Sequence, residues 1–132
     1  MLITLGTIVI IMSLWGMTHG DEWAEIGWGE GNVLAHDEAY EEMWALHLMP
    51  LGVMAIITAL IVTGKELAKI AMFAPIVLVN MLGGMLILTR DNGYGGTPTG
   101  VSAALAGLMM LATILTCASG FMHKGDTEES GD

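Results

Sequence analysis

The stretch that decides the fold is residues 20–42, GDEWAEIGWGEGNVLAHDEAYEE, which carries eight acidic side chains and no lysine or arginine. It lies between segments that are almost entirely apolar. The chain has 132 residues, of which 54% are hydrophobic and only 14% are charged. This contrast is typical of an integral membrane protein whose polar segments lie outside the bilayer. We therefore predict an all-α membrane protein.

The apolar residues fall into four blocks, at approximately residues 2–17, 43–63, 70–89 and 100–122. Each block is close to the ~20 residues that a helix needs to cross the ~30 Å hydrocarbon core of a bilayer. A soluble amphipathic helix would present polar residues at every third or fourth position, and these blocks do not. The sequence thus predicts one domain of four transmembrane helices over residues 1–124, followed by an acidic C-terminal tail over residues 125–132.

The four basic residues indicate the orientation of the chain. Lys65 and Lys69 lie in the link between the second and third blocks. Lys124 follows the fourth block, whereas Arg90 alone follows the third. Because basic residues concentrate on the cytoplasmic side of a membrane, we expect both termini to be cytoplasmic. Residues 20–42 are then extracytoplasmic.

The acidic linker divides into two parts by composition. Residues 21–32 contain three glycines, which disfavour a regular helix, and we expect a loop there. From Val33 onward the residues are good helix formers, which predicts a helix that begins in water and continues into the second span. Trp23, Trp28 and Trp44 are predicted to anchor the chain at the membrane interface, because an indole ring is apolar but carries one N–H group.

Small residues mark where helices are expected to touch, because they permit close approach of two backbones in a membrane. The predicted packing residues are Gly83, Gly84, Gly100, Ala103, Ala104 and Gly107. Asn80 is the deepest strongly polar residue of the third block, and we expect it to form an interhelical hydrogen bond. Its alternatives are a cofactor contact or a pore lining. Cys117 is the only cysteine, which excludes an internal disulfide.

A metal site is an alternative use of the second helix. His36, Tyr40, Met43 and His47 recur at spacings of four, three and four, so they share one helix face. Imidazole, phenol and thioether groups beside carboxylates are suited to copper or another transition metal. However, His36 and His47 are about 16 Å apart along a helix, so one ion cannot bind both. Metal binding is therefore the less favoured hypothesis, and we expect bound lipid instead.

The remaining features bound the function. A net charge of −10 argues against nucleic acid and anionic lipid as partners. The sequence has no serine–histidine–acid set, no phosphate-binding glycine loop and no metalloprotease motif, so we do not expect an enzyme. We expect a non-catalytic accessory subunit that packs with other integral membrane subunits, in an energy-transducing or oxidoreductase complex. The alternatives are a homo-oligomeric transporter or channel that uses Asn80 and His47, and a metal-binding supporting subunit that uses the His36–His47 face.

Overall fold

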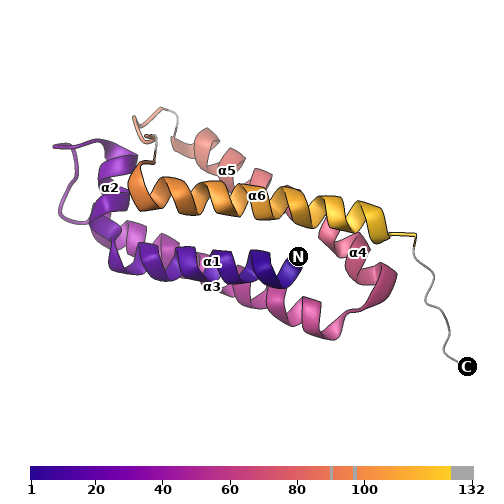
Figure 1. The fold of residues 1–132 in the computed structure, drawn as a ribbon. Helices are drawn as coiled ribbons and strands as arrows, with labels where there is room; N and C mark the ends of the chain where they lie inside the picture. Colours follow the sequence, from indigo (N-terminus) through magenta and orange to yellow (C-terminus); the bar gives the residue numbers. More distant parts are fainter. Residues whose placement is uncertain (90, 97, 126–132) are drawn as a thin grey trace, which may run out of the picture.

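The structure is a computed structural model that describes residues 1–89, 91–96 and 98–125. Every regular element within these ranges is an α-helix (Figure 1), which confirms the all-helical fold class. The helices are α1 (Leu2–Thr18), α2 (Gly20–Trp28), α3 (Asp37–Ile61), α4 (Gly64–Met72), α5 (Ala74–Thr89) and α6 (Gly100–His123).

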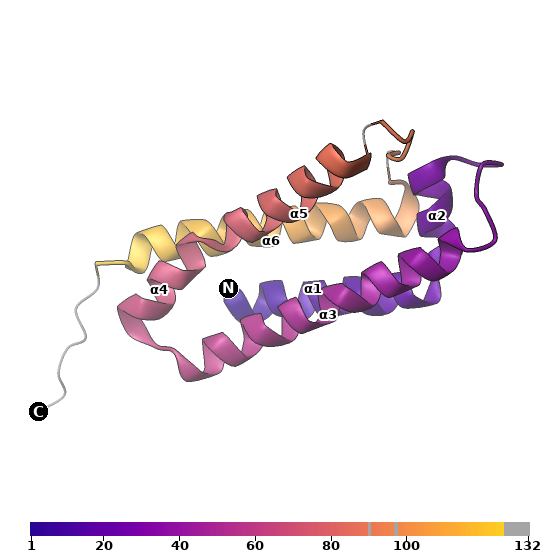
Figure 2. The same ribbon diagram turned by 180° about the vertical axis from the view of Figure 1, so that it is seen from behind.

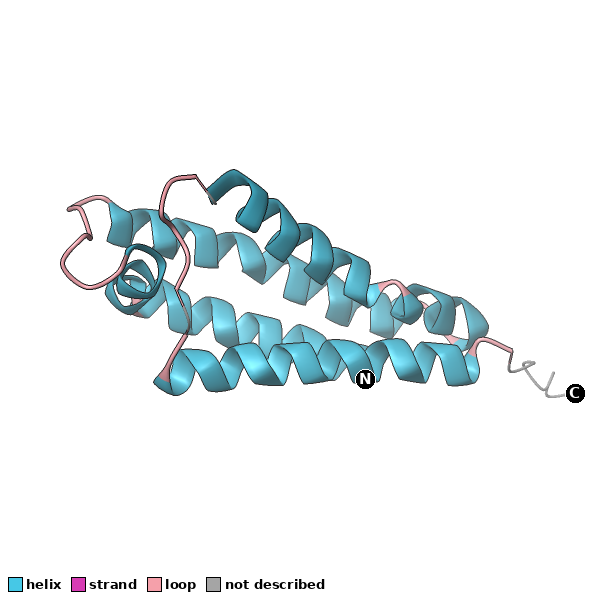
Figure 3. Ribbon diagram, turned by 90° about the horizontal axis from the view of Figure 1, so that it is seen from above, coloured by secondary structure: helices cyan, strands magenta, loops and turns pink. Residues whose placement is uncertain are grey.

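The helices form an elongated bundle in which α1 lies against α3 and α6 lies against α4 and α5 (Figures 1 and 2). The α2–α3 and α5–α6 connections lie at one end of the bundle. The N-terminus, the α3–α4 connection and the C-terminal end of α6 lie at the other end (Figure 2). Helix α2 runs across the first end, so it caps the bundle (Figure 3).

Two of the described helices, α3 and α6, are long and apolar enough to cross a membrane. Helices α1 and α2 pass the same test only together, and their axes are bent by 89°. The described part of the chain therefore has two candidate spans, or three if the bent pair counts as one. The prediction of four spans goes beyond this result.

The predicted third span is divided, which corrects the boundaries expected for it. Lys65 and Lys69 do not lie in a tight link but belong to the separate helix α4. Glu66 in the first turn and Lys69 in the last turn suit the helix dipole, and their side chains form a 2.7 Å ion pair. The chain breaks at Phe73 and restarts with Pro75 in the first turn of α5, where a missing backbone N–H is tolerated.

The predicted loop at residues 21–32 is also wrong in part, because Gly20–Trp28 is the helix α2. Its buried positions recur with the spacing of one helix face: Gly20, Trp23, Ala24 and Gly27. Asp21 and Glu22 lie in its first turn, where the helix dipole favours negative charge. Helix α3 begins at Asp37 instead of Val33, and the Asp37 carboxylate accepts a 2.7 Å hydrogen bond from the backbone N–H of Leu34.

Helices α1 and α3 cross with their backbones almost in contact. A Cβ atom at Gly6 would lie 2.6 Å from the carbonyl oxygen of Gly52, and one at Gly52 would lie 2.7 Å from that of Gly6. Further along, the hydroxyl of the fully buried Ser13 donates a 2.8 Å hydrogen bond to the carbonyl oxygen of Ala45. This crossing fixes the position of α3, and therefore of the side chains that α3 presents to the rest of the chain.

Candidate functional site

The capped end of the bundle gathers most of the polar contacts between helices. The loop before α6 docks on α2, because the backbone N–H of Gly95 donates a 2.7 Å hydrogen bond to the carbonyl oxygen of Gly27. The ring of Tyr94 occupies the space that a side chain at position 27 would need. The hydroxyl of Ser102 donates a 2.7 Å hydrogen bond to Glu22 and so joins α6 to the same cap.

Tyr94 connects this cap to α3. Its hydroxyl donates a 2.6 Å hydrogen bond to Oε1 of Glu41, a carboxylate that is only 7% exposed. The rings of Tyr94 and Trp28 pack edge to face, with their centroids 5.0 Å apart. Burial, and then the neighbouring Glu41 carboxylate, raise the pKa of Tyr94, so the phenol stays protonated and acts as a donor.

A cavity of about 620 Å³ opens between α3 and α5 beside this contact. Its polar and aromatic lining residues are Trp28, Tyr40, Glu41, Trp44, His47, Thr89 and Tyr94. A second, more apolar cavity of about 320 Å³ continues between α1, α3, α5 and α6. The two cavities share Leu48, Leu51 and Met81 in their linings. We call the two together the α3–α5 groove.

The four predicted metal-binding residues lie along one exposed face of α3 and do not converge. Nε2 of His36 is 3.5 Å from a carboxylate oxygen of Asp37, and its ring meets that of Tyr40 edge to face. Nδ1 of His47 lies at hydrogen-bond distance from the carbonyl oxygen of Met43. Among the described residues, no group of three or more His, Cys, Asp and Glu side chains is arranged to hold a metal ion. The geometry therefore gives the metal hypothesis no support.

The predicted packing residues are exposed or half-buried, and none of them is buried against another helix. A Cβ atom at Gly83, Gly84, Gly100 or Gly107 would meet no atom within 4 Å. Ala104 is exposed and Ala103 is half-buried. The exposed Asn80 donates a 3.0 Å hydrogen bond to the carbonyl oxygen of Ile76 in its own helix, not to another helix. Their use in packing stays a prediction about contacts with other chains.

Of the three tryptophans predicted as interface anchors, Trp23 is buried in the core, whereas Trp28 and Trp44 are half-buried. Trp23 is only 9% exposed and packs in the core with Ala45 and Leu48. Trp44 is half-buried beside it, with ring centroids 5.9 Å apart, and Trp28 packs on the α5–α6 loop. Trp23 is buried because α2 is a helix that turns this side chain towards α1 and α3.

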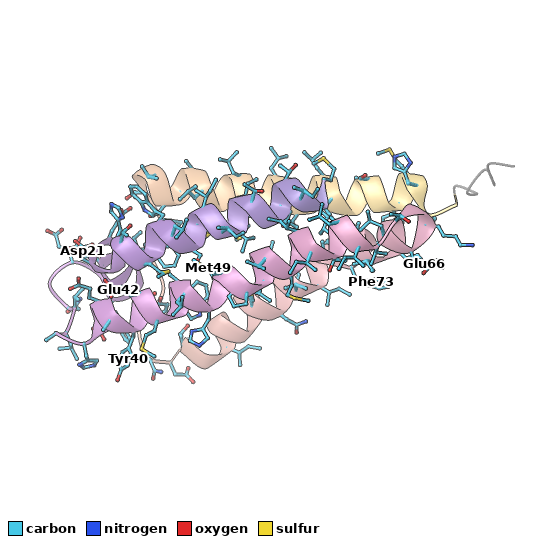
Figure 4. All side chains as sticks on the ribbon, turned by 90° about the horizontal axis from the view of Figure 1, so that it is seen from below. Asp21, Tyr40, Glu42, Met49, Glu66 and Phe73 are labelled. Carbon is cyan, nitrogen blue, oxygen red and sulfur yellow. The ribbon has the colours of Figure 1, made fainter. Side chains whose placement is uncertain are left out.

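The acidic side chains divide between the two ends of the molecule. Figure 4 shows Asp21 and Glu42 at the capped end and Glu66 at the opposite end. In the same view Tyr40 lies on α3 near Glu42, at the capped end where the groove begins. The capped end therefore joins carboxylates and aromatic rings to an apolar groove, an arrangement suited to ligand binding. Comparison of the chain with protein-family models, curated proteins and solved structures gives no match.

Proposed function

We propose that this chain is a non-catalytic subunit of a larger integral membrane complex and that α5 and α6 pack against a neighbouring subunit. The observation that carries the proposal is the position of α5. This helix packs mainly on α6 and on the end of α4. Ile76, Val79 and Ile87 on α5 are 53%, 68% and 73% exposed. These exposed side chains, among the described residues of α5, are thus free for contacts outside the chain.

One face of α5 has the composition of a helix-packing surface. Ile76, Asn80, Gly83 and Ile87 follow one another at spacings of four, three and four, so they form one stripe along the helix. Lipid chains are as apolar as the helices, so association in a membrane depends on close packing of small residues and on interhelical hydrogen bonds. The open space at Gly83 permits such an approach.

Helix α6 carries a stripe of the same kind. Gly100, Ala104, Gly107 and Leu111 repeat the spacing of four, three and four, and all four are exposed. The amide of Asn80 on α5 retains a second N–H and a carbonyl oxygen for a partner. An interhelical hydrogen bond of this kind contributes about 0.6–2 kcal/mol. Together these features favour a protein neighbour over lipid on this side of the molecule.

The proposal includes four membrane crossings with both termini in the cytoplasm. Helix α1 and helix α5, with 17 and 16 residues, are about 25 Å long, close to the hydrocarbon thickness. Lys65 and Lys69 lie in α4, directly after the α3–α4 connection, and Lys124 follows α6. Both positions are at the end of the bundle where the N-terminus lies. The acidic cap at the opposite end is then extracytoplasmic. An energy-transducing or oxidoreductase complex remains the expected host.

The test is mild detergent extraction from native membranes, followed by mass analysis of the intact assembly. We expect the chain to migrate with other membrane polypeptides. Gly83→Leu, which fills the α5 stripe, should release it from them. Thr4→Leu is the matched control, because Thr4 lies on the exposed stripe of α1 with Ile3 and Thr7. Recovery of the wild-type chain alone or as a homo-oligomer would overturn the proposal, and solute flux by that homo-oligomer in liposomes would favour the transporter alternative.

A further inference from the structure

We infer that the α3–α5 groove binds one lipid-like amphiphile with an ammonium headgroup, with the headgroup at the capped end and the apolar chain directed along α3. The volumes of about 620 and 320 Å³ lie in the range of ordinary ligand sites, roughly 300–1,000 Å³. The shared lining residues Leu48, Leu51 and Met81 make the two cavities neighbours. One molecule with a polar end and an apolar end therefore fits both.

The length of the groove suits a single extended apolar chain. Its lining on α3 extends from Tyr40 to Thr58, which is about 27 Å along the helix axis. The apolar part runs from Leu48 to Thr58, or about 15 Å. This is half of the ~30 Å hydrocarbon core. A chain that enters beside the cap would follow this apolar lining towards Thr58, about one turn before α3 ends at Ile61.

The lining of the larger cavity, of about 620 Å³, selects the charge of the headgroup. Glu41 is its only carboxylate, and no lysine or arginine is found among the lining residues that the structure describes. The Tyr94 hydroxyl donates its hydrogen bond to Oε1 of Glu41, so Oε2 of the same carboxylate is left for a ligand cation. The neighbouring segment of residues 20–42 also carries no lysine or arginine. The Glu41 carboxylate and this acidic segment would repel an anionic headgroup and attract a cationic one.

Four aromatic side chains surround the same space: Trp28, Tyr40, Trp44 and Tyr94. The faces of such rings attract cations, and aromatic groups with a carboxylate are a usual means of recognising quaternary ammonium. Tyr40 is 61% exposed although it is large and aromatic. A ligand headgroup in the cavity would cover part of this exposed ring. Charge and aromatic lining thus indicate the same chemical class.

The binding test uses purified full-length protein in a neutral maltoside detergent, with tryptophan fluorescence as the signal because Trp28 and Trp44 line the cavity. The probes are dodecyltrimethylammonium, an uncharged dodecyl amphiphile and an anionic one, each below its micelle concentration. We expect saturable binding of the ammonium probe, at least tenfold tighter than that of the other two. Equal binding of all three would overturn the inference.

Two charge variants separate the site from the general acidity of the cap. Glu41→Gln retains an acceptor for Tyr94 but removes the charge, and it should weaken ammonium binding at least tenfold. Glu42→Gln is the matched control, since Glu42 packs beside Gly20 and does not line the cavity. Tyr40→Leu removes an exposed ring without a loss of core packing and should weaken binding several-fold. Unchanged binding in both Glu41→Gln and Tyr40→Leu contradicts the inference.

Two last measurements test whether the ligand needs an apolar chain and whether the molecule in the groove is a lipid. Leu51→Trp narrows the passage between the two cavities, so it should weaken dodecyltrimethylammonium and leave the weaker binding of tetramethylammonium unchanged. Tetramethylammonium that binds as tightly as the long-chain probe would indicate a small solute and exclude the amphiphile. A photoreactive residue at position 51, activated in native membranes, should capture lipid. Capture of a polypeptide there would make the groove a helix-docking site and reject the inference.

Discussion

The crossing of α1 and α3 makes a sharp prediction about alanine substitutions at glycine. A Cβ atom at Gly6 would lie 2.6 Å from the carbonyl oxygen of Gly52 and 2.8 Å from Cγ1 of Ile56. Backbone cannot move aside as a flexible side chain does, so the two helices must separate. Such overpacking costs about 1–3 kcal/mol. Glycine to alanine in a helix otherwise gains up to about 1 kcal/mol, so Gly6→Ala should lower the free energy of unfolding by up to about 2 kcal/mol.

Gly107→Ala is the matched control, because a Cβ atom at Gly107 on α6 would meet nothing within 4 Å. It should raise the free energy of unfolding by up to about 1 kcal/mol. The two variants should then differ by about 1–3 kcal/mol when each is unfolded by denaturing detergent in mixed micelles and followed by far-UV circular dichroism. If Gly6→Ala proves as stable as Gly107→Ala, the α1–α3 crossing is not a backbone contact and the reasoning fails.

Two further substitutions test the contacts that position the groove. Ser13→Ala removes the hydrogen bond to the carbonyl oxygen of Ala45, and unfolding in mixed micelles should show a loss of about 0.6–2 kcal/mol; no loss would mean that the bond contributes nothing to the α1–α3 contact. Tyr94→Phe removes the bond to Glu41, so hydrogen exchange at the Gly95 amide should accelerate while the core helices stay protected. The pKa of Tyr94 is raised above that of the unfolded chain, so its stabilising effect is present below about pH 10 and lost above it. The stability difference between wild type and Tyr94→Phe should narrow as pH rises past that value, and a constant difference would contradict the assigned contact.

The helical nature of the chain could be predicted from hydropathy, but the cap could not. Residues 21–32 contain glycines that lower helix propensity, and a loop was expected there. One of these glycines, Gly27, packs against Tyr94, and Gly20 at the start of the helix packs against Glu38 and Glu42. Both are contact positions on the buried face of α2. Propensity is a weak guide when tertiary contacts decide the outcome, and those contacts join residues far apart in the sequence.

The close helix contacts were also predicted at other positions than those the structure uses inside the chain. Small residues at Gly83 and Gly107 meet no neighbour, whereas Gly6, Gly52 and Gly120 lie against backbone atoms of another helix. Spacing alone does not separate the two groups, because apolar helices contain small residues at many positions. What distinguishes them is the partner across the interface, and a single sequence does not identify it. The sequence indicates Trp28, Tyr40 and Trp44 as candidate residues but not Tyr94. Its hydrogen-bond partner Glu41 lies 53 residues away, and no local pattern connects the two.

The groove and the proposed subunit interface have a common structural origin in the way α5 is held. Helix α3 is fixed along its length by α1, whose glycines and Ser13 permit close contact. Among the described residues, α5 meets the α3 side of the bundle at Met81, which packs against the Trp23–Ala45–Leu48 cluster. The Tyr94–Glu41 hydrogen bond joins the loop after α5 to α3 at the cap, and α4 connects the two helices at the other end. The groove lies between these contacts, because α5 has no continuous contact with α3 like that of α1 in the described part of the chain. The apolar lining of that volume makes emptiness costly, since its walls lack contact atoms on one side. Helix α5 is therefore stabilised on one face by the ligand that fills the α3–α5 groove. On its outer face it is stabilised by the subunit that packs against the stripe from Ile76 to Ile87.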